Sequence, residues 1–243
     1  MTAPVFLADR ADLDADVIVL TGAEGRHAAT VRRIRPGERA DVADGDGMIA
    51  ECVVTAAGGG QVELRVQARR EVPVPDPRIT VVQAIPKGER AELAVETMTE
   101  VGVDVVVPWQ AERCVARWPA DRAAKSLARW RSTAREAAKQ ARRARVPEVT
   151  GLASPADVAA RISAAACAVL LEPGAAGSLA RLPLPDHGDI VLVVGPEGGL
   201  SPAEVDAFTE AGAVPARLGE SVLRTSTAGA VAAAVLMSRS GRW

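Results

Sequence analysis

Two segments near the C-terminus combine residue types that suit the binding of a small ligand. The sequence GPEGG at 195–199 ends an apolar run, and glycines let backbone amides approach a ligand closely because they lack a Cβ. The segment 218–230, LGESVLRTSTAGA, adds apolar side chains for a slot and the donors of Arg224 and Thr227. A lone glycine turn is commonly only a strand–helix connection. The pair at this spacing predicts a binding site that contains one carboxylate, Glu197.

The elements around these segments are those of a parallel α/β domain. The apolar runs at 166–172 and 189–195 are typical of parallel strands that helices cover on both faces. In such sheets ligands bind at the carboxyl ends of the strands. A helix is predicted from Ser201, whose spacing to Glu204 is that of a capping box. The site is therefore expected at the carboxyl edge of the sheet.

The first part of the chain has a different pattern. Residues 1–72 are mostly strand-like, with turns rich in Gly and Asp between the strands, and they predict a small β-barrel-like domain. Three prolines within 71–78 indicate a linker. Residues 73–243 then form the α/β domain. The strand-like runs of the first domain are 17–20, 40–54 and 61–68.

Positive charge is concentrated in one segment, although the net charge of the chain is only −2. A long helix is predicted over 120–145, and from Arg122 to Arg145 nine basic residues face a single acid, Glu136. Charge runs are often only solvated helix faces. Such faces usually mix signs to form i,i+4 pairs, so the near absence of acids favours a polyanionic partner.

Several other functions are excluded by what the sequence lacks. It has no dinucleotide or P-loop glycine motif, no H-E-x-x-H and no G-x-S-x-G. Its three cysteines and two histidines are too scattered for a disulfide framework or a typical metal centre, so no metal is expected. No signal-like start and no apolar run of about 18 residues is present. We expect a cytoplasmic protein without a membrane partner.

The two ligand-binding segments resemble the paired signature of a known family. VVGPEGGLSPAEVDAF at 193–208 and RLGESVLRTSTAGAVA at 217–232 are similar to the RsmE family of the SPOUT superfamily. Further stretches of the family's pattern occur in order, so the resemblance covers nearly the whole chain. These stretches are HAATVRRIRPGE at 27–38, PKGERAELAVETMTEVGV at 86–103, ERC at 112–114 and KQARRARVPEV at 139–149.

The resemblance implies both an activity and a fold. Members of the family use S-adenosylmethionine to methylate N3 of a uridine in small-subunit (16S) ribosomal RNA. The implied fold is a PUA-like, RNA-binding β-barrel followed by a SPOUT-type α/β domain with a deep trefoil knot. The implied assembly is a homodimer built around the knot, with the helix at about 227–239 near the partner subunit. General rules of chain threading disfavour knots, so the knot is expected from the resemblance alone.

The resemblance also implies roles for individual residues. Arg224 is expected to stabilise a deprotonated uracil or to hold its phosphate, and Glu197 to bind the cofactor or accept a proton. The sequence identifies no general base. The residues expected to bind the cofactor are Leu171, Gly195, Glu197, Gly198, Leu218, Leu223, Thr225, Thr227 and Ala228. The residues expected to bind RNA are Arg26, Arg32, Arg33, Arg35, Arg113, Arg131, Arg135, Lys139, Arg142 and Arg143.

A few positions depart from the family's usual pattern. Thr97 stands where a Lys is common, Lys139 replaces an acid, and Ser226 replaces a Glu. At the start, Val5-Phe6 replaces an Arg-Phe pair. These changes affect the expected RNA contacts more than the cofactor site. His27 matches the family pattern beside basic residues, although a lone histidine more often packs, and we favour packing.

Two other functions stay open at this point. One is a methyltransferase of the same superfamily that acts on another RNA, such as a transfer RNA. The other is a noncatalytic RNA-binding protein whose α/β domain serves as a scaffold. The second alternative predicts no affinity for S-adenosylmethionine.

Overall fold

The structure, a computed structural model, describes residues 3–243 as two compact units. The N-terminal unit runs to Val74 and also includes Ala138–Val146, and the C-terminal unit comprises Pro75–Ala137 and Pro147–Trp243. The segment 138–146, expected in the second domain, thus belongs to the N-terminal unit. The boundary falls within helix α4 (Ala120–Gln140), which ends five residues earlier than predicted.

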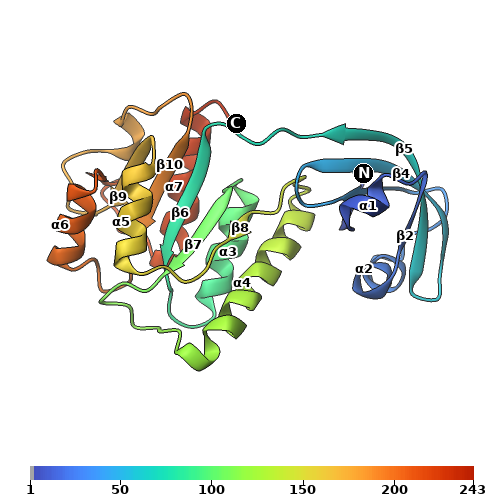
Figure 1. The fold of residues 1–243 in the computed structure, drawn as a ribbon, viewed down its shortest axis with the longest axis horizontal. Helices are drawn as coiled ribbons and strands as arrows, with labels where there is room; N and C mark the ends of the chain where they lie inside the picture. The colour runs from blue at the N-terminus through green and yellow to red at the C-terminus, as the bar shows by residue number, and fades with distance from the viewer. Residues whose placement is uncertain (1–2) are drawn as a thin grey trace. The chain divides into compact units, whose positions relative to one another are not determined.

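The N-terminal unit is built on one five-stranded sheet of order β1-β3-β4-β5-β2 (Figure 1). β1 pairs with β3 in parallel, and the remaining neighbours are antiparallel. Side chains alternate between core and solvent along β2, where Ile18 and Leu20 are buried and Val17 and Val19 are exposed. The strands are β1 (Val5–Leu7), β2 (Val17–Leu20), β3 (Arg39–Ala43), β4 (Met48–Gly58) and β5 (Gln61–Glu71).

Short helices complete this unit. α1 (Arg10–Leu13) and α2 (Gly22–Arg26) are each about one turn long, and α2 continues directly into a π-helix, η1 (His27–Val31). A continuous helical segment thus follows β2, and its second half has the wider π geometry. The ring of His27 packs edge-on against Phe6, with 5.8 Å between the ring centroids, as the packing interpretation predicted.

The last turn of α4 and the segment that follows it are held inside the N-terminal unit by charged contacts. Lys139 is 5% exposed, and its Nζ lies 2.8 Å from Glu24 Oε1. Arg145 donates to the carbonyl oxygen of Val72 and lies 2.7 Å from Asp46. Ala144, which lies between Lys139 and Arg145 in the sequence, is buried in a small apolar cluster with residues of β1, β3 and β4. Two basic residues of the predicted charged segment thus have structural partners.

The C-terminal unit is a six-stranded sheet of order β11-β9-β10-β6-β7-β8 in which all neighbours are parallel. The central strands are buried along almost their whole length, which confirms the doubly covered parallel sheet predicted from the apolar runs. The strands are β6 (Arg78–Ala84), β7 (Val105–Trp109), β8 (Glu148–Val149), β9 (Cys167–Leu171), β10 (Asp189–Val194) and β11 (Val214–Ala216).

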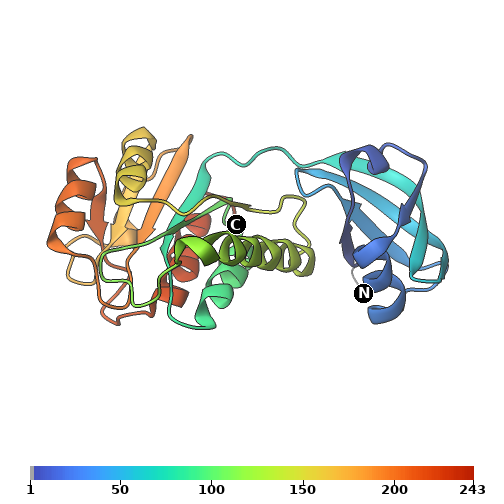
Figure 2. The same cartoon turned by 60° about the horizontal axis from the view of Figure 1, so that its bottom comes forward.

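Helices cover both faces of this sheet. Helices α5 and α6 lie on one face, and α3 and α7 lie on the other (Figures 1 and 2). The predicted capping box at Ser201 is confirmed, and a second one, formed by Ser154 and Asp157, begins α5. The remaining helices of the unit are α3 (Arg90–Glu100), α5 (Pro155–Ala164), the 3₁₀ turn η2 (Leu179–Arg181), α6 (Pro202–Glu210) and α7 (Thr225–Arg239).

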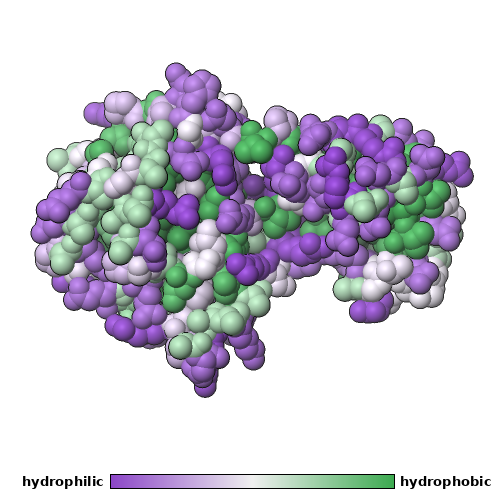
Figure 3. All heavy atoms as spheres, in the orientation of Figure 1, coloured by the Kyte–Doolittle hydropathy of each residue, from purple (hydrophilic) through white to green (hydrophobic). Residues whose placement is uncertain are grey.

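The surface is mostly hydrophilic on the face shown in Figure 3. Polar and charged side chains predominate over each unit there, and apolar groups form separate patches among them. Within residues 3–243, no helix has the length and apolar character needed to cross a membrane.

Candidate cofactor pocket and RNA-facing residues

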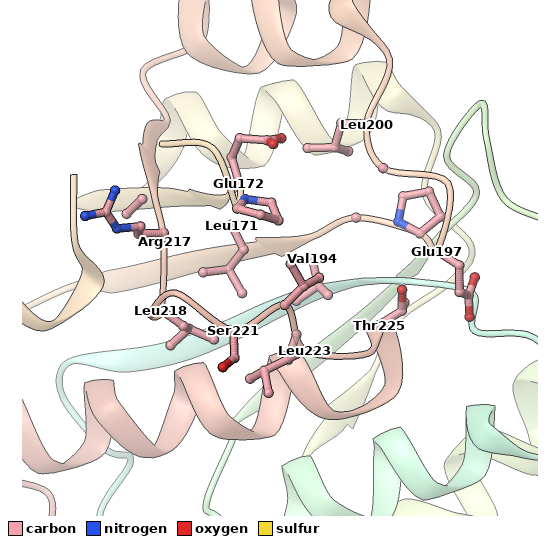
Figure 4. A pocket seen from close by; sticks show the side chains of 18 of the residues that line it. Leu171, Glu172, Val194, Glu197, Leu200, Arg217, Leu218, Ser221, Leu223 and Thr225 are labelled. Carbon is pink, nitrogen blue, oxygen red and sulfur yellow. The ribbon is translucent and has the colours of Figure 1, made fainter. Parts of the chain in front are cut away.

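A pocket of about 330 Å³ opens at the carboxyl ends of β9 and β10, where the sequence predicted a site. The GPEGG turn and the segment that leads into α7 form opposite walls, so the two predicted segments meet at one cavity (Figure 4). Pockets of this volume suit small-molecule cofactors. The principal lining residues are Arg113, Leu171, Glu172, Pro173, Val194, Gly195, Pro196, Glu197, Gly199, Leu200, Ala216, Arg217, Leu218, Gly219, Ser221, Val222, Leu223, Thr225 and Ala228.

Most residues expected to bind a cofactor line this pocket, and two do not. Gly198 and Thr227 are absent from the lining. The hydroxyl of Thr227 instead donates to the carbonyl oxygen of Arg224, at the first turn of α7. The expected residues that do line the pocket are Leu171, Gly195, Glu197, Leu218, Leu223, Thr225 and Ala228.

Two glycines of the turn are required for different physical reasons. A Cβ on Gly198 would lie 3.1 Å from the backbone oxygen of Arg113, so this glycine allows a close approach of two loops rather than of a ligand. Gly199 has a φ of +70°, a conformation that side-chain-bearing residues rarely adopt. Gly198 and Gly199 therefore shape the turn. Gly195 directly follows β10 and lines the pocket.

The carboxylate of the turn braces a neighbouring loop. Glu197 Oε1 accepts a hydrogen bond of 3.1 Å from the backbone N–H of Lys87, in the connection between β6 and α3. Glu197 also lines the pocket and lies at one rim of it (Figure 4). One of its oxygens thus holds two loops together, and the group remains at the edge of the cavity.

A second carboxylate of the pocket, Glu172, was not predicted from the sequence. It directly follows β9 and lines the pocket, and its side chain lies on the opposite side of the chain from Leu171 (Figure 4). Arg113, Arg217 and Glu197 each bond to protein backbone. The carboxylate of Glu172 has no protein partner in the described part of the chain, so it is the charged group of the pocket that is free to meet a ligand. Its position after an apolar strand was the signal that could have found it.

Loops on one side of the pocket are tied together by two further contacts. Arg113 Nη1 donates to the carbonyl oxygen of Leu200 at 3.1 Å. Glu204 is 5% exposed, and while Oε2 completes the capping box at Ser201, Oε1 accepts the backbone N–H of Glu112 at 2.7 Å. Two hydrogen bonds therefore join the start of α6 to the loop after β7, next to the GPEGG turn.

Arg224 stands at the opposite wall. It is the N-cap of α7, and its carbonyl oxygen accepts the N–H groups of Thr227 and Ala228. Its side chain is exposed and has no protein partner in residues 3–243. It does not line the pocket itself but directly precedes Thr225, which does.

Cys114 is a buried thiol next in sequence to the pocket residue Arg113. Burial raises the pKa of the Cys114 thiol, which keeps it protonated beside Arg113 at neutral pH. Among residues 3–243, no three His, Cys, Asp or Glu side chains are grouped to hold a metal ion.

The basic residues expected to bind RNA, nine arginines and Lys139, fall into three groups. The first group is exposed on the N-terminal unit without an ion-pair partner among the described residues, and comprises Arg26, Arg32, Arg33 and Arg35. The second, also exposed and likewise without a partner in 3–243, comprises Arg135 and Arg142. The third is engaged with protein: Arg113 at Leu200, Arg131 at the carbonyl oxygen of Val149, Lys139 at Glu24, and Arg143 in partly buried surroundings.

Comparison with known proteins bears directly on this pocket. The model of an RNA methyltransferase domain matches residues 74–237, and the model of an RNA methyltransferase PUA domain matches 20–67. Ribosomal RNA small subunit methyltransferase E of Mycobacterium bovis is 47% identical over 100% of this chain and 94% of its own length. The chain belongs to the RsmE family. The Bacillus subtilis member is 31% identical over 88% of this chain and 87% of its own.

A solved RsmE structure supports the same assignment. The Neisseria gonorrhoeae RsmE bound to S-adenosyl methionine superposes with a TM-score of 0.85, at 28% identity, over 98% of both chains. The fold described above, with its PUA-type and methyltransferase units, is therefore that of the RsmE family. Both expectations from the sequence, the family and the α/β class, are confirmed.

Proposed function

We propose that this RsmE-family protein transfers the methyl group of S-adenosylmethionine to N3 of a specific uridine in small-subunit ribosomal RNA. The observation that carries the proposal is the pocket at the carboxyl ends of β9 and β10, with its apolar walls and one unpartnered carboxylate. The relatives of this protein in the RsmE family, one of which was solved with S-adenosyl methionine bound, support the same proposal.

The residues of the pocket fit this cofactor. Leu171, Val194 and Leu218 offer an apolar slot suited to an adenine ring, and the backbone of residues 218–223, which makes no hydrogen bond within the described chain, can meet its polar edge. Glu172 would accept hydrogen bonds from hydroxyl or ammonium groups of the cofactor, since its carboxylate is acceptor-only. When bound, the cofactor supplies an electrophilic methyl group on a sulfonium sulfur.

The protein's own contribution is positioning and charge stabilisation. Holding the two reacting atoms in line can supply up to roughly 7–11 kcal/mol of the barrier reduction. Arg224, exposed beside the pocket, would stabilise negative charge on a uracil that loses its N3 proton, or hold the phosphate of the same nucleotide. Glu197 would mainly position the turn through Lys87, and its second oxygen is available to a cofactor or to a proton. No residue is assigned as general base.

RNA binding is proposed for the exposed arginines without a partner rather than for the whole basic segment. Lys139 is left out because its amine is buried against Glu24. Neutralising Arg32, Arg33 and Arg35 together should lower the salt dependence of RNA binding by about one unit of slope for each lost phosphate contact. An unchanged slope would show that these arginines are only solvated.

We also propose the knot and the homodimer that the family resemblance implies. For the knot, support comes from the path of the chain. β11 pairs at the edge of the sheet, α7 then packs against the central β6 and β10, and the 172–188 connection bonds to both Arg217 and Arg239. A crystallographic chain trace through 172–239 tests whether the chain is threaded.

For the dimer, support comes from exposed apolar side chains beside the pocket. Val231 on α7 is 43% exposed, and Val222 in the preceding segment is 75% exposed. The opposite stripe of α7, which includes Ala233, is buried inside the unit. One side of the helix is thus left for a partner subunit.

The activity is tested with purified protein, isotope-labelled S-adenosylmethionine, and three separate substrates: small ribosomal subunits, naked 16S RNA and transfer RNA. Digestion to nucleosides and mass spectrometry identify the product. We expect label in 3-methyluridine from ribosomal material. Label in transfer RNA would favour another substrate, and no cofactor binding at all would favour a noncatalytic RNA-binding protein.

A further inference from the structure

One buried polar side chain, Gln83, has no part in the pocket wall but is joined to it. Gln83 is 0% exposed near the end of the central strand β6, a strand otherwise composed of apolar residues apart from Arg78 and Thr80. Its Nε2 donates to the carbonyl oxygen of Ala84 at 2.9 Å and to that of Thr225 at 3.1 Å. Thr225 begins α7 and lines the pocket. A buried amide therefore connects the sheet to the start of that helix.

The contact is closely packed as well as hydrogen-bonded. A Cβ added to Gly229, one turn into α7, would lie 2.8 Å from Gln83 Oε1 and 3.0 Å from Met98 Sδ. The side chain of Gln83 thus lies under the first turn of α7. Its Oε1 is buried without a hydrogen-bond partner among the described residues, which is costly for a core position. An apolar residue at this position would avoid that cost. What glutamine has and an apolar residue lacks is the hydrogen bond to the carbonyl oxygen of Thr225, which joins β6 to α7.

The segment that this contact holds has few other restraints. Residues 218–223 make no backbone hydrogen bond to any part of the described chain. At its first end, Arg217 donates its N–H to Gly177 and accepts the N–H of Leu179. At its second end lie the first turn of α7 and the Gln83 contact. The wall of the pocket is thus a free span of chain fixed at two anchor points.

We infer that Gln83 is a positioning residue for the cofactor: by anchoring Thr225 it holds the 218–223 wall of the pocket in its binding conformation. The inference rests on the proposed function, because it assigns this wall to S-adenosylmethionine. Loss of the anchor lets the wall sample other conformations, and binding then has to select one of them. Cofactor affinity falls in proportion to the fraction of molecules with the wall in place.

The test compares Gln83→Met with a matched control, Thr80→Val. Methionine keeps the length and unbranched shape of glutamine but has no donor. Thr80 is also buried in β6, at 1% exposure. It lies three residues before Gln83, farther from the end of the strand that adjoins the pocket. Titration calorimetry with S-adenosylmethionine should show affinity about tenfold weaker for Gln83→Met and within twofold of wild type for Thr80→Val.

Two readouts separate positioning from general damage to the core. In steady-state methylation, KM for S-adenosylmethionine should rise in Gln83→Met while kcat and KM for RNA stay within twofold. Hydrogen exchange should accelerate at the amides of Thr227 and Ala228, which donate to the carbonyl oxygen of Arg224, and stay unchanged in β6, β10 and α3. A folded Gln83→Met protein with wild-type affinity and exchange would overturn the inference.

Other outcomes are also decisive. If the wild type binds no S-adenosylmethionine, the proposed function fails, and exchange at the amides of Thr227 and Ala228 still tests the anchor by itself. If Gln83→Met does not fold, glutamine-labelled wild-type protein is examined by NMR. Slowly exchanging side-chain amide protons of Gln83 support the anchor, and rapid exchange overturns it.

Discussion

Among the side chains that line the pocket, Glu172 is the one that we expect to bind a ligand most directly. Its carboxylate lines the cavity without a protein partner among residues 3–243, whereas the other charged lining groups are bonded to backbone. A group of this kind contributes little to folding and is available for binding. Its energetic effect should therefore appear in ligand affinity and not in stability.

Replacing Glu172 tests that separation. Glu172→Gln keeps the size of the side chain, but its amide nitrogen can only donate, so one acceptor and the charge are lost. We expect affinity for S-adenosylmethionine to fall by about 1.5–3 kcal/mol, or roughly 10- to 150-fold, with an unchanged melting temperature. Calorimetry and thermal unfolding measure the two quantities.

The cofactor's product distinguishes two roles for the same carboxylate. If Glu172 accepts from ribose hydroxyls, S-adenosylhomocysteine should lose affinity for Glu172→Gln as much as S-adenosylmethionine does. If it faces the sulfonium charge, only S-adenosylmethionine should be affected. If Glu172→Gln binds both S-adenosylmethionine and S-adenosylhomocysteine as tightly as the wild type does, Glu172 is not part of the site.

Among the secondary-structure elements, α6 has a double task. Its capping-box acid, Glu204, also receives the backbone N–H of Glu112, so it connects the helix start to the loop after β7. The corresponding acid of α5, Asp157, is exposed and completes a capping box with Ser154; within the described chain its side chain bonds to no other loop. Comparing the two helices therefore separates the effect of the capping box from the effect of the bond between Glu204 and Glu112.

Glu204→Ala is therefore compared with Asp157→Ala. Loss of a cap alone should cost about 0.5–2 kcal/mol of unfolding free energy, and Asp157→Ala is expected in that range with unchanged cofactor affinity. Glu204→Ala should cost more, because the partly buried hydrogen bond from the N–H of Glu112 is lost as well, and it should weaken S-adenosylmethionine binding severalfold. Denaturant unfolding and calorimetry compare the two, and equal effects on both properties would refute the connecting role.

Elements with a strong local signal were the ones that the sequence predicted well. The apolar runs of β9 and β10 and the capping box of α6 depend on nearby residues, and all were found in place. The second capping box at Ser154 carried the same signal and was overlooked. The π-helix η1 and the two-residue strand β8 have no local pattern that distinguishes them, because both depend on tertiary packing.

The candidate site was predicted at the level of segments more than of residues. Strand order brings β9 and β10 together, so Gly195 and Leu171 meet as expected. Gly198 and Lys139 could not be judged from sequence, since their surroundings come from residues distant along the chain: Arg113 for the glycine and Glu24 for the lysine. Spacing shows which residues are available, and packing determines which of them face a ligand.

For the protein as an assembly, the prediction concerns α7. Val231→Glu places a charge on the exposed side of the helix and should convert the proposed homodimer into monomers with little loss of monomer stability. Val214→Glu is the matched control, because Val214 is 44% exposed and Val231 is 43% exposed. Light scattering at low micromolar concentration measures the mass. A monomeric wild type that binds S-adenosylmethionine would contradict the dimer.

The activity that we propose for this protein is the transfer of one methyl group to a uridine N3 of 16S ribosomal RNA. Methylation at N3 blocks the pairing edge, so it can be located by the arrest of reverse transcription and identified by nucleoside mass spectrometry. We predict one 3-methyluridine in 16S RNA of the parent strain, absent when the gene is deleted, restored by the wild-type gene and reduced with Glu172→Gln. A deletion strain that retains this 3-methyluridine at the parental level would contradict the account.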